Sequence, residues 1–113
     1  MASSRAETIH CSVEQGSNLP TEIGGADAVC AAIAQATLPV MQRLGIDASQ
    51  LAVGVRVVSN HRIAAVASLS GRQLPEHVID VADRTLNRRA IEMLAAAMAA
   101  EVSNANDDQA GEQ

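Results

Sequence analysis

The stretch "LAVGVRVVSNHRIAAVASLSG" constrains the fold more than any other part of the chain, because it holds two runs of strict two-residue alternation around a short polar break. Alternation of this kind is typical of half-buried β-strands that are joined by a tight turn. We expect a β-hairpin over residues 51–69, with Asn60 at its tip because asparagine tolerates a positive φ angle. Its inward side chains are Leu51, Val53, Val55, Val57, Ile63, Ala65, Ala67 and Leu69.

Four further elements follow from local patterns. "ETIHCSVE" alternates and predicts a strand. Helical spacing of apolar residues predicts one helix from about Asp27 to Leu44 and a second, capped by Asp83 or Thr85, running to about Val102. Residues 77–82 are rich in β-branched side chains, which favours a strand, although their spacing also suits a helix.

These elements predict one α+β domain with the order β-α-β-β-β-α. Hydrophobic residues make up 48% of the chain, which is enough for a globular core. We expect an antiparallel meander sheet with both helices packed on one face. Residues 7–102 would form this domain, residues 1–6 a flexible tail, and residues 103–113 a disordered acidic tail.

Cys11 and Cys30 are the two cysteines, and both are expected to face the layer between the sheet and the first helix. Two readings stay open: a pair of buried free thiols, or a disulfide if the α-carbons approach within about 4.4–6.8 Å. Free thiols would indicate a cytoplasmic protein, whereas a disulfide would indicate a periplasmic or secreted mature domain. Thiol catalysis is poorly supported, because the chain has no C-x-x-C motif.

No metal, cofactor or catalytic site is predicted. His10 and Cys11 are neighbours on a strand, so they project to opposite faces and cannot share a metal ion. The chain has no lysine, which excludes a Walker-type phosphate loop, and it has no G-x-S-x-G motif for a serine hydrolase.

Composition also argues against nucleic-acid and membrane partners. The net charge is −5, and no aromatic residue is present to stack on bases. No apolar run reaches the roughly 20 residues that membrane insertion needs. A helix-turn-helix over residues 40–58 is a disfavoured alternative, because its second segment is valine-rich and alternates strictly.

The sheet face turned away from the helices is the candidate interaction face. Its side chains are small, mixed and only weakly polar, which suits contact with another protein but is also typical of a sheet that simply faces solvent. We therefore expect a non-catalytic domain that binds a protein partner or itself, as in a homodimer. The alternative is a small-ligand carrier or minor enzyme with a pocket between helices and sheet. The candidate residues are His10, Ser12, Glu14, Arg56, Val58 and Val66.

Overall fold

The computed structural model describes residues 9–82 and 84–111, with side chains described as far as Ala105. The expected N-terminal tail, residues 1–6, and the expected cap Asp83 lie outside these residues. Short 3-10 turns occur at 16–18, 21–23 and 48–50. The main elements are β1 (His10–Glu14), α1 (Ala26–Leu44), β2 (Leu51–Ser59), β3 (Arg62–Leu69), β4 (Arg72–Gln73), β5 (His77–Asp80) and α2 (Arg88–Gly111).

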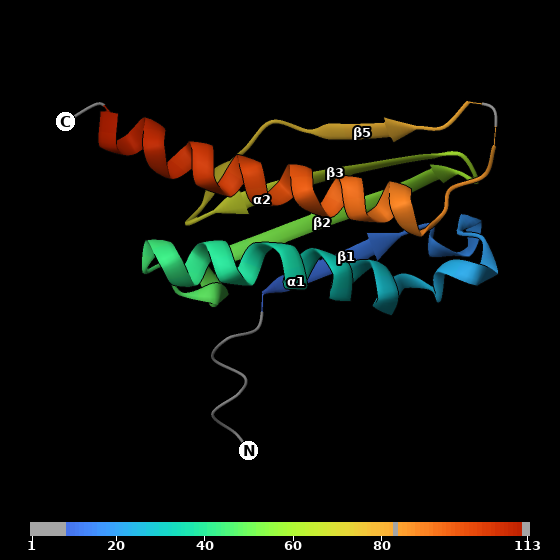
Figure 1. Ribbon diagram of the computed structural model, residues 1–113, viewed down its shortest axis with the longest axis horizontal. Helices are drawn as coiled ribbons and strands as arrows, with labels where there is room; N and C mark the ends of the chain where they lie inside the picture. The colour runs from blue at the N-terminus through green and yellow to red at the C-terminus, as the bar shows by residue number, and fades with distance from the viewer. Residues whose placement is uncertain (1–8, 83, 112–113) are drawn as a thin grey trace, which may run out of the picture.

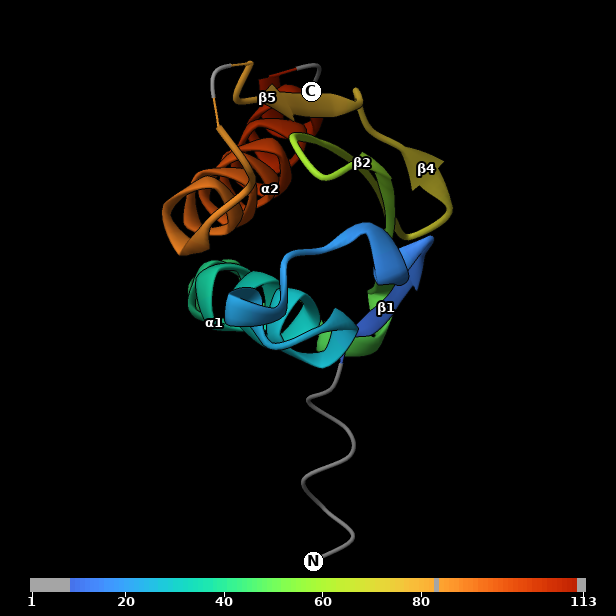
Figure 2. The ribbon, with the colours of Figure 1, turned by 90° about the vertical axis from the view of Figure 1, so that its right-hand side faces the viewer.

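The chain forms two layers, a five-stranded sheet and a pair of helices. α1 and α2 lie side by side in front of the sheet in Figure 1, and Figure 2 shows both helices on the same side of it. The α+β class and the packing of both helices on one face are therefore confirmed, and residues 77–80 are a strand.

The sheet is mostly antiparallel, with the order β1-β2-β3, and both β4 and β5 pair with the outer side of β3. One pairing differs from the expected antiparallel meander, because β1 runs parallel to β2, with His10 opposite Ala52 and Glu14 opposite Arg56. α1 carries the chain back along the sheet before β2 begins, and such a crossover connects parallel neighbours.

The β2–β3 hairpin is present, but its turn differs from the expected one. The pairing shifts between Val57 and Ser59, and Asn60 does not have a positive φ. The irregularity at Val58 changes the local twist, so the turn does not need a left-handed residue. That conformation occurs instead at Ser70 and Gly71, which link β3 to β4 with φ angles of 53° and 85°.

Both ends of α2 lie beyond their expected positions. Asn87 caps its start, because the Asn87 side-chain oxygen accepts a hydrogen bond from the Ala90 backbone N–H at 2.9 Å. The helix continues to Gly111, so residues 103–111 are helical rather than a disordered tail. Val102 and Ala105 are both buried, and this extension of the apolar stripe holds the additional turns against the protein.

An aliphatic core fills the space between the two layers. Thr37 is a fully buried polar residue, and its hydroxyl donates to the Ile33 carbonyl at 2.8 Å, so it has a hydrogen-bond partner. The remaining large side chains that are fully buried are Val29, Ile33, Met41, Leu51, Val55, Val57, Ile63, Leu86, Leu94, Met98 and Val102.

Candidate interaction surface

The face of the sheet opposite the helices is called the open face here. Strand register builds it in cross-strand rows. In one row the carboxylate of Glu14 on β1 neighbours Arg56 on β2, and the row continues through Ala64 on β3 to β5. In the next row Ser12 neighbours Gly54, which is paired with Val66. Charged groups therefore lie toward the ends of the rows, and small or apolar residues occupy their centre.

Two shallow hollows lie side by side on the open face. They share Ser12, Gly54 and Val66, so the missing side chain of Gly54 lies where they meet. Glu14, Arg56 and Glu76 border one hollow. His10, Ser68 and Gln73 border the other. The open face is thus slightly concave at its centre and polar at its rim.

The candidate residues from the sequence all lie on the open face, but the hollows bring only five of them together. Val58 lies farther along β2, where its side chain is 42% exposed. Sequence reasoning missed Val78 on β5, which is 52% exposed and extends the Glu14–Arg56–Ala64 row. The alternation within "HVID" would have found it, but the choice between strand and helix was still open for that segment.

Gly54 offers a way to fill the centre of the open face without disturbing the fold. A Cβ atom built at this position meets no atom within 4 Å, and the residue does not have a positive φ. We expect Gly54→Gln to leave the free energy of unfolding unchanged or to raise it by about 0.5–1 kcal/mol, because glycine weakens a strand interior. Urea unfolding followed by far-UV circular dichroism measures this, and a loss above about 1 kcal/mol would contradict it.

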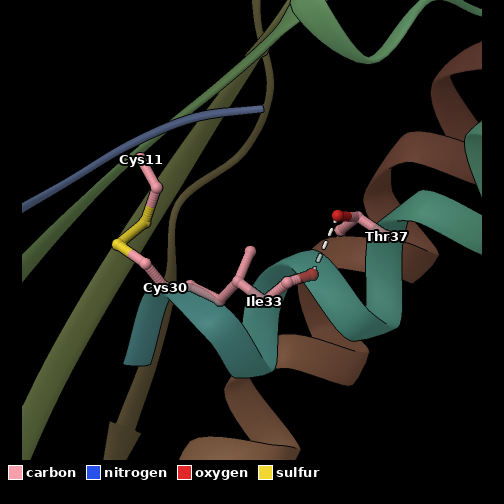
Figure 3. Close-up of a disulfide and its surroundings, with 4 residues drawn as sticks. All are labelled: Cys11, Cys30, Ile33 and Thr37. Atoms are coloured by element: carbon pink, nitrogen blue, oxygen red, sulfur yellow. Dashed lines mark hydrogen bonds between the residues drawn. A yellow bond between two sulfur atoms is a disulfide. The ribbon is translucent and has the colours of Figure 1, made fainter. Parts of the chain in front are cut away.

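A disulfide joins Cys11 on β1 to Cys30 on α1, with an S–S distance of 2.06 Å and a Cα–Cα distance of 5.8 Å. Figure 3 shows the bond bridging from the strand to the helix, one turn before Ile33. Both cysteines are only partly buried. The bond therefore lies at the edge of the interior, beside a hollow lined mostly by apolar side chains.

An ion-pair cluster lies at the hairpin end of the sheet. Arg62 donates to the Asp80 carboxylate at 2.7 and 2.8 Å, and the His61 ring nitrogen lies 3.4 Å from its other oxygen. The hydrogen bond from Arg62 lowers the pKa of Asp80 below its ordinary 3.8, with the nearby positive charge of Arg62 and the His61 contact adding to this effect. This cluster links β3 to β5.

The lowered pKa of Asp80 predicts a pH dependence of stability. A carboxyl whose pKa is lower in the folded state stabilises the fold above its unfolded pKa, and this contribution is lost as pH falls through the folded value. We expect Asp80→Asn to unfold at a lower temperature than the unmodified chain at pH 7, and this gap to close below about pH 3.8. Thermal unfolding between pH 2 and 7 tests this; a gap that persists unchanged at pH 2 would contradict it, and Arg62→Gln should behave in the same way.

A second polar pair connects the sheet to α2. His77 on β5 lies 2.6 Å from the carboxylate of Glu101, and both side chains are partly buried. Two backbone bonds also tie the hairpin tip to the segment after β5, from Val81 N–H to the His61 carbonyl and from Leu86 N–H to the Asn60 carbonyl. The three histidines are therefore dispersed, with His10 alone on the rim of the open face.

The structure bears on the alternative sites. Within residues 9–82 and 84–111, no group of three His, Cys, Asp or Glu residues is placed to hold a metal ion. Residues 51–59 form β2, so the recognition helix of a helix-turn-helix is replaced by a strand. The layer that the ligand-carrier alternative needs is packed with fully buried side chains such as Ile33, Leu94 and Met98.

Neither α1 nor the described part of α2 is long and apolar enough to span a membrane. Comparisons of the chain with protein-family models, with curated proteins and with solved structures found no match.

Proposed function

We propose that this is a non-catalytic association domain that binds another protein, or a second copy of itself, through the open face of the sheet. One observation carries the proposal: both helices cover the other face, and the centre of the uncovered face is occupied by Gly54, Ala64 and Val66 rather than by charged side chains. Apolar surface rimmed by polar groups is typical of protein contact sites.

The exposure of individual side chains supports the same function. Val58 and Val78 are exposed large apolar residues on this face, at 42% and 52%. Ala64 lies between Arg56 and Val78 in its row and is only 4% exposed, so the surface there is hollowed rather than flat. A concave apolar centre bordered by Glu14, Arg56 and Glu76 suits a protruding apolar side chain of a partner.

Site-specific photo-cross-linking in the native host tests the proposal. A benzophenone amino acid replaces Val58 on the open face in one variant and Met93, which is 52% exposed on α2, in a matched control. We expect a discrete cross-linked product from position 58 and none from position 93. Adding Gly54→Gln to the first variant should abolish the product, because the longer side chain fills the hollows.

The mass of the product identifies the partner as a second copy or another protein. Equal products from both positions, or a position-58 product that survives Gly54→Gln, would contradict association through the open face.

The disulfide supports work in an oxidising compartment, because such bonds persist in periplasmic and secreted proteins and are rare in the cytosol. Titration of thiols under denaturing conditions, on protein taken from its native host, tests this location. Two reactive thiols before reduction would contradict it.

A further inference from the structure

We propose that two copies of this chain pair through β1, antiparallel and about a two-fold axis at Ser12. The pairing would join the two sheets into one continuous sheet. This inference rests on the proposed association function and names both the partner and the strand that meets it.

β1 is the edge of the sheet that is open to pairing. β2 lies on one side of it, and no other strand within residues 9–82 and 84–111 pairs with its outer side. Beyond the end of β1, the side-chain amide of Asn18 donates to the Val57 carbonyl at 2.8 Å, which covers the rest of that edge of β2. The free edge is therefore confined to His10–Glu14.

The opposite edge of the sheet is protected, and β1 is not. At that edge β3 is flanked by β4 and β5, which are only two and four residues long and are separated by a segment containing Pro75. Short edge strands and proline are common devices against pairing between chains. β1 has neither a proline nor a register irregularity, so an added strand can extend its ladder.

The side chains of β1 are self-complementary in one arrangement. His10, Ser12 and Glu14 are exposed on the open face. An antiparallel partner centred on Ser12 places His10 opposite Glu14 of the second copy, and places the second copy's His10 opposite Glu14. A histidine ring can donate a hydrogen bond to a carboxylate in either protonation state. A parallel partner in register would instead set Glu14 against Glu14, which is unfavourable.

The helix side of the same edge supplies apolar surface. A hollow of about 300 Å³ lies between β1 and α1, lined mainly by Ile9, the two disulfide-bonded cysteines, Ala34 and Leu38, with Asp27 also in contact. A two-fold contact is formed by the same patch on both copies, so each copy would present this aliphatic surface to the other. The contact would thus combine backbone pairing, two charge pairs and apolar burial.

Charge exchange on β1 tests the pairing. Sedimentation equilibrium should find a dimer of the 11.7 kDa chain, with a dissociation constant that rises about tenfold or more in His10→Glu and in Glu14→Arg, because each sets like or unpaired groups opposite each other twice. The double variant His10→Glu/Glu14→Arg should restore dimerisation. Gln42→Glu, which adds the same charge on an exposed part of α1, should leave it unchanged.

The outcomes separate this inference from the proposed function. A chain that stays monomeric up to about 0.5 mM overturns the β1 pairing, while cross-linking to a different protein at position 58 would still support the association function. A dimer that Gly54→Gln dissociates and His10→Glu does not also overturns the pairing and keeps the open face as the contact. Circular dichroism of each variant verifies that it is folded, and Glu14→Arg gives an independent test if His10→Glu is not.

Discussion

Replacing both cysteines with alanine should lower the free energy of unfolding by roughly 3 kcal/mol, because the bond closes a loop of about 20 residues in the unfolded chain. For a domain of this size, the loss corresponds to a fall in melting temperature of about 10–15 °C. The structure suggests that β1 is affected most, since its ladder to β2 is only five residues long and the disulfide ties it to α1.

Far-UV circular dichroism is the suitable measurement, because the chain has no aromatic residue for fluorescence. The unmodified protein in reductant should match the Cys11→Ala/Cys30→Ala variant, and reductant should leave that variant unchanged. A difference below about 1 kcal/mol between the oxidised protein and the variant would contradict a stabilising bond.

Leu94→Ala should lower the free energy of unfolding by about 2–5 kcal/mol, because it removes three buried carbon atoms and leaves a cavity under α2. Leu94 is fully buried in the aliphatic core. Alanine is the strongest helix former, so the loss reports on packing rather than on helix propensity.

Met93→Ala is the matched control, one position earlier on the same helix. Met93 is 52% exposed, and its replacement should change the stability by less than about 0.5 kcal/mol. Urea unfolding of both variants gives the comparison. Similar losses in the two variants would show that α2 does not bury the face that its sequence pattern indicates.

Much of the fold could be predicted, because alternation and helical spacing determine which side of an element is buried. The hairpin was expected over 51–69 and occurs as β2 and β3, and α1 begins one residue before its expected start. Gly45 ends α1 in the left-handed conformation that its position indicates, with φ of 73°.

Orientation and short elements could not be predicted in the same way. Alternation in β1 is identical for a parallel and an antiparallel neighbour, so the pattern carries no information on its direction. β4 has two residues, too few for any period to be recognised. The start of α2 was placed too early because Asp83 and Thr85 are as good caps by composition as Asn87.

The candidate interaction surface followed from the same alternation, which is why His10, Ser12 and Glu14 share one side of β1. Its hollows did not, because they depend on register between strands, and register sets Gly54 beside Ser12 and Val66. The cysteine pairing was also undecided by the sequence, since it depends on a distance across two elements.

The link from β1 to α1 gives the domain an asymmetric response to mechanical tension. A pull on the chain ahead of β1 would reach Cys11 and pass through the S–S bond into the helix at Cys30, bypassing the loop between them. That loop cannot be extended while the bond is intact, so the edge strand cannot be peeled away residue by residue. Under load from its N-terminal side, the domain should yield in one step, and a reducing environment would convert this into gradual unravelling.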